Sequence, residues 1–260
     1  MSPDGRKRAT VRTSKDWWTL VVIANGRSRE IYRVTRHYRV VNDDAGPIEL
    51  LDWSGDSRWI FFVIDPDGSG SIQADGLMLR AISAQGGRAV RIARMLVYRD
   101  YLTWCGGRLV FTAGIDRVAT NRKRLLEASP PGWRPRRLAP DSRLSFGSVA
   151  CSPTGRWLVA QSQRSSGNAN FFATHWALWR VGLDGTMRRL TAPPPGSADE
   201  SPRFSRDGKA LLFVRMRRGN GELYVRRAGR TIGPLLFLGN SIGYYGHHDW
   251  WLTTDWSLGR

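Results

Sequence analysis

The chain has 260 residues, of which 41% are hydrophobic, and this composition suits one large domain with a buried core. Its formal net charge is +18, from 40 Lys and Arg against 22 Asp and Glu, and the arginines are spread along the chain rather than gathered into one run. This spread argues against a specific nucleic-acid interface but predicts weak, nonspecific attraction to anions. No run of 18 apolar residues occurs, which excludes a membrane-spanning helix.

A turn motif opens the chain and recurs along it. In Ser2-Pro3-Asp4-Gly5-Arg6 the Asp-Gly pair predicts a tight turn, because Gly adopts positive φ without steric cost and Asp bonds to its own backbone. Full or looser copies are anchored at Ser54, Cys105, Ser152, Ser205 and Ser257. The intervals between successive anchors are 52, 51, 47, 53 and 52 residues, so the repeat runs through the whole sequence.

Each interval contains four short apolar segments separated by turns. In the fourth interval these segments are Phe146–Cys151, Trp157–Gln161, Trp176–Val181 and Met187–Leu190. Four antiparallel strands repeated at this period are typical of propeller blades. We therefore predict an all-β protein, a single β-propeller domain over residues 1–260 with five four-stranded blades.

The repeat resembles that of the TolB-like β-propellers, in which a Ser-Pro-Asp-Gly-Arg/Lys turn joins the first two strands of a blade. The resemblance covers nearly the whole chain and is best at Ser2–Arg6, Ser152–Trp157 and Ser201–Val225. It is weakest at Cys105–Arg108, where one residue is missing. It implies the fold and says little about function, because such repeats serve scaffolds, periplasmic proteins and the gating domains of peptidases.

The two ends of the chain are expected to complete one blade together. The first motif leaves the first blade without an inner strand, whereas Leu252–Trp256 is an inner strand with nothing after it. Pairing this segment with the strand after Arg6 would close the ring and remove open sheet edges. The alternative is a six-bladed propeller truncated at its N-terminus. Localisation stays open: the chain as written has no export signal, which fits the cytoplasm, and a truncated start fits an extracytoplasmic protein.

The segment 65–76 has the spacing of a calcium loop. Its candidate ligands are Asp65, Asp67, Ser69 and Asp75. Gly76 occupies the position where a bidentate Glu belongs, and this repeat type carries Asp/Gly-rich hairpins at the same place. A solvated hairpin is therefore favoured over a Ca²⁺ site, and no cofactor is expected.

The two cysteines fall at neighbouring positions of the motif in adjacent blades. Cys151 matches Trp53 and Trp104, whereas Cys105 matches Ser54, an offset of one residue. Because such an offset turns side chains to opposite faces of a strand, two unpaired buried cysteines are favoured over a disulfide.

Recognisable catalytic motifs are absent from the sequence. Ser152 lacks the G-x-S-x-G context of a hydrolase, and no phosphate loop or H-E-x-x-H occurs. A non-enzymatic protein is therefore favoured. The alternative is a propeller hydrolase or lyase, metal-dependent or not, that uses His247, His248 and Asp249.

One loop face is the expected binding surface. In a propeller the inter-blade loops and the hairpins between second and third strands lie on the same face, around the mouth of the central channel. Residues expected there are Tyr244, Tyr245, His247, His248, Asp249, Arg164, Arg215, Arg217, Arg218 and Asn220. Aromatic rings supply contact area and Arg supplies planar donors. We therefore predict a monomeric scaffold that binds an acidic protein or peptide segment; packing of the rings between blades is the alternative.

Overall fold

The computed structural model describes residues 1–36, 45–66, 68–139, 143–165, 175–241 and 245–250. Within these ranges the regular secondary structure consists of β-strands and two 3-10 turns, η1 (Ile72–Ala74) and η2 (Arg99–Tyr101). None of the helices in the described ranges reaches the length and apolarity needed to cross a membrane.

The strands form five antiparallel sheets, each built from strands consecutive in sequence. Sheet A contains β1 (Lys7–Thr13), β2 (Trp17–Ala24) and β3 (Arg27–Thr35). Sheet B contains β4 (Ile48–Trp53), β5 (Trp59–Ile64), β6 (Leu77–Ser83) and β7 (Val90–Met95). Sheet C contains β8 (Leu102–Cys105), β9 (Arg108–Ala113), β10 (Arg124–Ala128) and β11 (Arg136–Arg137). Sheet D contains β12 (Leu144–Cys151), β13 (Trp157–Arg164), β14 (Ala177–Gly182) and β15 (Met187–Arg189). Sheet E contains β16 (Ser197–Phe204), β17 (Ala210–Arg217), β18 (Asn220–Arg227) and β19 (Arg230–Asn240).

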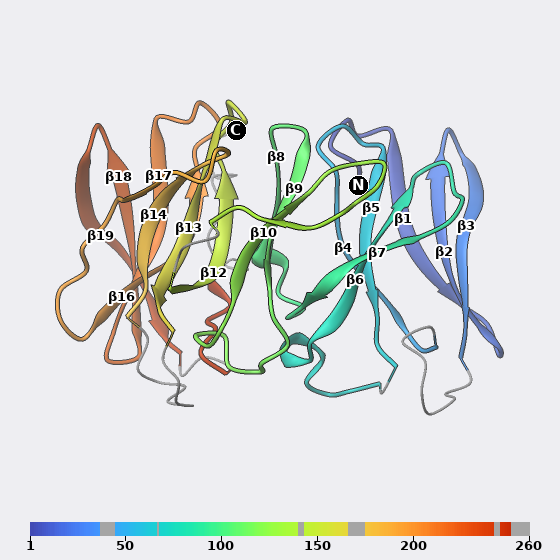
Figure 1. The fold of residues 1–260 in the computed structure, drawn as a ribbon, viewed down its shortest axis with the longest axis horizontal. Helices are drawn as coiled ribbons and strands as arrows, with labels where there is room; N and C mark the ends of the chain where they lie inside the picture. The colour runs from blue at the N-terminus through green and yellow to red at the C-terminus, as the bar shows by residue number, and fades with distance from the viewer. Residues whose placement is uncertain (37–44, 67, 140–142, 166–174, 242–244, 251–260) are drawn as a thin grey trace.

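The hydrophobic core is divided among the gaps between neighbouring sheets. One cluster joins sheets A and B, a second joins B and C, a third joins C and D, and a fourth joins D and E. Sheets B, C and D thus bury apolar residues from both of their faces, which is how propeller blades share a core. None of the clusters in the described ranges joins sheet A to sheet E, which lie at opposite ends of the molecule in Figure 1.

The recurrent Ser-x-Asp motif is a hydrogen-bonded turn between the first two strands of a sheet. In sheet E, Ser205 Oγ donates to Asp207 Oδ1 at 2.7 Å and accepts from the Ala210 amide at 3.0 Å. The turn before β1 repeats this arrangement with Ser2, Asp4 and Lys7. The serine satisfies local backbone groups, so the motif specifies the turn and hence the fold.

The first strands of three sheets carry a β-bulge at similar positions. The pairing register shifts in β4 after Leu50, in β12 after Phe146 and in β16 after Glu200. Bulges bend a strand and re-aim its side chains. Here they lie on the strands that bound the cavity described next.

The predicted closing strand, Leu252–Trp256, lies outside the described residues, and within them sheet A has three strands. Ring closure and the choice between five and six blades therefore stay predictions.

Candidate functional site

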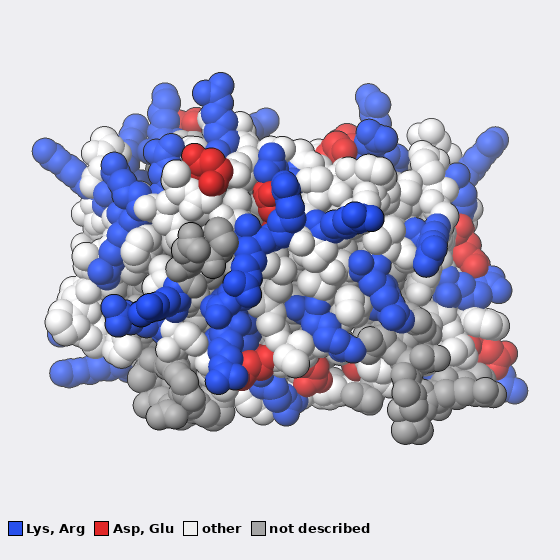
Figure 2. All heavy atoms as spheres, in the orientation of Figure 1, with Lys and Arg blue, Asp and Glu red and all other residues white. Residues whose placement is uncertain are grey.

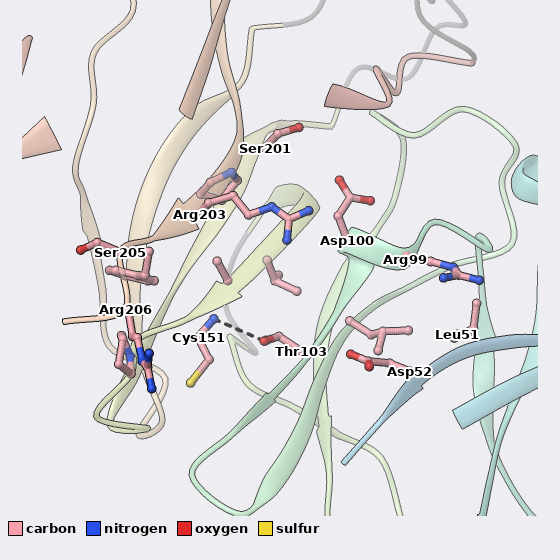
Figure 3. A pocket seen from close by; sticks show the side chains of 16 residues that line it. Leu51, Asp52, Arg99, Asp100, Thr103, Cys151, Ser201, Arg203, Ser205 and Arg206 are labelled. Atoms are coloured by element: carbon pink, nitrogen blue, oxygen red, sulfur yellow. Dashed lines mark hydrogen bonds between the residues drawn. The ribbon is translucent and has the colours of Figure 1, made fainter. Parts of the chain in front are cut away.

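The innermost strands of sheets B to E enclose a cavity of about 630 Å³, called here the inner-strand cavity (Figure 3). Its lining residues are Leu51, Asp52, Arg99, Asp100, Leu102, Thr103, Val149, Ala150, Cys151, Pro153, Ser201, Pro202, Arg203, Phe204, Ser205 and Arg206. Because the lining includes Pro153, Ser205 and Arg206, the cavity extends to the end of the sheets that carries the Ser-x-Asp turns.

Charged side chains face this cavity from two sides. Arg203 extends from β16 toward Asp100 on η2, and Arg206 follows in the adjoining turn (Figure 3). Arg99 turns toward β4, where its guanidinium donates to the Leu50 carbonyl at 3.0 Å.

A buried group of histidines and carboxylates lies beside the cavity, and we call it the His–acid cluster. His247 Nε2 is 3.0 Å from Asp100 Oδ1 and 3.1 Å from Oδ2. The imidazole stacks on Tyr98, with ring centroids 3.8 Å apart, and its side chain is 1% exposed. Its Nδ1 lies 3.3 Å from Asp249 Oδ1, within ion-pair range.

His248 forms the second half of the cluster. Its Nδ1 is 2.8 Å from Glu200 Oε2, and the two side chains are 7% and 2% exposed. Trp250 then anchors the segment: its indole N–H donates to Met216 Sδ at 3.0 Å, and its ring covers Gly221, where a Cβ would lie 2.5 Å from the ring. The absence of a side chain at Gly221 therefore allows the segment to pack against sheet E.

The neighbouring carboxylates favour the charged form of both histidines by raising their pKa values. Burial lowers the pKa of His247, but the charge and hydrogen bond of Asp100, aided by Asp249, outweigh it and raise the pKa to about 10. Burial likewise opposes the charged form of His248, and the charge and hydrogen bond of Glu200 raise its pKa overall. The acids of the cluster are thus neutralised internally.

This geometry is unlike a nucleophile–base pair. Ser148 Oγ donates to Asp100 Oδ2 at 2.5 Å, so the carboxylate lies between the hydroxyl and His247. A serine hydrolase needs the imidazole against the hydroxyl, with the acid on the far side of the ring. In the described part of the chain no group of three or more His, Cys, Asp or Glu side chains is arranged to hold a metal ion.

The residues predicted to line an open loop face lie in different environments. His247 and His248 were expected at a channel mouth and are buried in ion pairs, because Asp100 on η2 and Glu200 on β16 meet them. Arg215, which was expected in a partner contact, is held by both oxygens of Asp199, at 2.7 and 2.9 Å, and its part in a partner contact stays a prediction. Its side chain is 16% exposed.

Other predicted residues are accessible. Arg217 and Arg218 are exposed at the hairpin between β17 and β18, and Tyr245 is half-buried. The guanidinium of Arg117 lies 5.2 Å from the Tyr245 ring centroid, and the Ala119 amide donates to the Tyr245 carbonyl at 2.7 Å. Tyr244 lies outside the described residues.

The candidate calcium ligands are distributed among separate partners. Asp65 Oδ2 accepts from the Ser69 amide at 2.9 Å, Asp75 Oδ1 pairs with Arg117 at 2.7 Å, and Asp67 lies outside the described residues. The calcium site stays a prediction.

The expectation of two unpaired cysteines is wrong. Cys105 and Cys151 form a disulfide, with Cα atoms 5.4 Å apart. The offset argument fails because the two residues belong to different sheets and Cys105 is the last residue of β8. The shortened turn that follows lets Gly106 approach Gly155 of the next sheet so closely that a Cβ on Gly106 would lie 2.6 Å from the Gly155 carbonyl oxygen.

Sequence reasoning missed the partners of the histidines. Asp100 is 147 residues from His247, and Glu200 is 48 residues from His248. No spacing rule connects such positions in one sequence. The only local signal was the carboxylate of Asp249 next to the histidines.

Comparison with known proteins supports the fold. No family model matches the sequence, and no curated protein matches it. Among solved structures the chain is similar to TolB from Acinetobacter baumannii, at TM-score 0.52 and 15% identity, covering 92% of this chain and 54% of that one. Putative TolB from Agrobacterium tumefaciens matches at TM-score 0.53 and 17% identity, covering 94% and 82%. An oligogalacturonate lyase in complex with manganese matches at TM-score 0.52 and 13% identity, covering 89% and 62%.

The chain therefore has the fold of the TolB-like propellers, as its turn motif predicts. It spans about half the length of the Acinetobacter TolB chain. Identities at this level describe the fold alone.

Proposed function

We propose that this protein is a non-enzymatic propeller that binds an acidic segment of a protein or peptide on the loop face that carries Tyr245, Arg217 and Arg218. The observation that carries the proposal is the state of the His–acid cluster. His247 and His248, the side chains best suited to acid–base chemistry, are buried and paired with carboxylates.

The loop face has features of a preorganised contact surface. Arg117 bridges two loops, because it pairs with Asp75 and lies over the Tyr245 ring. A ring held by a cation and a backbone hydrogen bond loses little further entropy when a partner covers it.

Charge supports an acidic partner. The net charge of +18 favours encounter with anionic surfaces. Lys and Arg side chains far outnumber acidic ones on the surface seen in Figure 2. Exposed arginines such as Arg217 and Arg218 offer planar donors to carboxylates.

A peptide-binding assay tests the proposal. Purified protein is presented with an array of acidic and charge-reversed peptides, and the best acidic ligand is titrated against wild type and the double variant Tyr245→Ala/Arg217→Ala. We expect the variant to lose at least tenfold in affinity with little change in melting temperature, since both residues are accessible.

The matched control is Arg156→Ala/Lys209→Ala, which removes two cations from the turn end of the sheets. Binding that survives the loop-face change but disappears in this control would place the partner on the other face. Equal binding of acidic and basic peptides would contradict the proposal altogether.

A further inference from the structure

The inner-strand cavity has its own chemistry, separate from the loop face. Its volume of about 630 Å³ falls within the range of about 300–1,000 Å³ typical of small-ligand sites. One part of its lining is apolar and comes from several sheets: Leu51, Leu102, Val149 and Phe204. The remainder is polar and contains three arginines.

The charge balance of the cavity favours an anion. Asp100 accepts a hydrogen bond from Ser148 and lies 3.0 Å from His247 Nε2, and neither of these two partners lines the cavity. Arg99 is partly compensated by Glu49, at 3.5 Å. The lining as a whole contains three arginines, Arg99, Arg203 and Arg206, against two aspartates, Asp52 and Asp100.

A second observation indicates a site for a ligand oxygen. Ser201 lines the cavity, is 3% exposed, and has no hydrogen-bond partner for its Oγ within the described residues. Its φ is 50°, an unusual value for Ser, at the bulge of β16. The Gln161 side chain holds the Ser201 amide at 3.2 Å. Strained backbone and an unsatisfied hydroxyl often mark functional positions.

We propose that the inner-strand cavity binds a small organic carboxylate with an apolar chain. Arg203 and Arg206 hold the carboxylate, for which the fork of a guanidinium is suited. The Ser201 hydroxyl donates to an oxygen of the ligand. Leu102, Val149 and Phe204 cover the apolar chain. This site does not depend on the partner proposed for the loop face.

Calorimetric titration with hexanoate and with its neutral analogue hexanamide tests the site directly. We expect saturable 1:1 binding of hexanoate and at least tenfold weaker binding of hexanamide. Inorganic phosphate should also bind at least tenfold more weakly than hexanoate, because it lacks an apolar chain. Equal affinities for hexanoate and phosphate, or no binding of hexanoate, would overturn the proposal.

Variants locate the binding. Arg203→Gln and Ser201→Ala should each weaken the binding of hexanoate at least fivefold. Arg206→Gln should also weaken this binding, and because Arg206 lies on an exposed turn the change leaves folding intact. Arg156→Gln is the matched control: it removes an exposed arginine from the equivalent turn of sheet D, outside the cavity. Loss of binding in the control as well as in Arg206→Gln would mean nonspecific attraction and would contradict the site.

Two further probes distinguish the source of the carboxylate. N-acetyl-leucine carries a free carboxylate like that of a peptide C-terminus. Its C-terminal amide, N-acetyl-leucinamide, lacks the negative charge of this carboxylate. If the free acid binds more tightly than hexanoate and its amide does not bind, the natural ligand is the C-terminus of a peptide; if hexanoate binds more tightly, it is a free small acid. Either result supports the site, whereas equal binding of N-acetyl-leucine and its amide contradicts it.

Discussion

Buried charges in this protein are stabilised by specific partners rather than by water. Lys123, which is 0% exposed, donates from Nζ to the carbonyls of Asp116, Val118 and Asn121. Asp199, also 0% exposed, holds Arg215 through two hydrogen bonds. Because an unpaired buried charge is costly, removing one member of such a set should cost more than removing a surface ion pair.

The pH dependence of stability should report the pair of His247 and Asp100. The folded-state pKa of about 10 lies above the ordinary value of 6.5, so the pair stabilises the fold fully below about pH 6.5. This contribution is lost as pH rises from 6.5 toward 10. Urea unfolding measured at intervals from pH 6 to pH 10 should show a fall in the free energy of unfolding, on the order of a few kcal/mol.

The variant Asp100→Asn is the control, since it removes the charge that raises the histidine pKa and should flatten the profile. Burial lowers the pKa of Lys123 to about 8, which acts in the opposite direction at high pH, but this group is common to both proteins. Parallel profiles of wild type and variant would show that His247 is not charged in the folded state.

Asp199→Ala should destabilise the fold by about 3–5 kcal/mol, because Arg215 would keep its charge in a mostly buried position. Chemical denaturation measures the loss. The double variant Asp199→Leu/Arg215→Met should recover most of it, since both charges are then absent. A double variant no more stable than the single one would mean that packing around Asp199, and not the charge, causes the loss.

At the scale of elements, the strand ends beside the cavity are fixed by contacts between sheets. Cys105 at the end of β8 is bonded to Cys151 at the end of β12. The Asp4 amide donates to Ser57 Oγ at 3.1 Å, joining the first two Ser-x-Asp turns across sheets A and B. Adjacent sheets are thus connected at their turns as well as through their cores.

Removal of the disulfide should lower the free energy of unfolding by about 2–4 kcal/mol, because the reduced unfolded chain is less constrained. Denaturation of Cys105→Ser/Cys151→Ser beside oxidised wild type measures this effect. Mass spectrometry of the wild type under non-reducing conditions should show a mass two hydrogens below that of the reduced chain. A variant as stable as wild type, or two free thiols in the wild type, would contradict the disulfide. A disulfide found by these measurements would favour an oxidising, extracytoplasmic location.

At the scale of the whole molecule, sheet A differs from the other sheets because it has three strands rather than four within the described residues. In that part of the chain β1 pairs with β2 alone. Exposed edge amides are a liability that propellers remove by ring closure. We keep the prediction that Leu252–Trp256 pairs there.

Hydrogen exchange of the β1 amides tests this closure. Alternate amides of an antiparallel strand point to each side, so those directed away from β2 are protected only if another strand pairs with them. We expect slow exchange along all of residues 7–13 in the full chain. In a variant that ends at Trp250, alternate amides of β1 should exchange rapidly and the protein should self-associate. Rapid exchange of those amides in the full chain would contradict closure by residues 252–256.

The sequence by itself determined the repeat, the all-β class and the Ser-x-Asp turns. These features depend on residues within a few positions of one another, such as Ser205, Asp207 and the amide of Ala210. A hydrogen bond formed within a turn is visible as a motif, and five nearly equal spacings are visible as a repeat.

Only the tertiary structure decided the environments of the site residues. His247 meets Asp100, and Cys105 meets Cys151, because different sheets converge at the inner strands. The orientation of Ser201 depends on the bulge of β16, since an extra residue in a strand changes the face to which its side chains point. Periodicity within a strand predicts which residues share a face, but long-range packing decides what each face contacts.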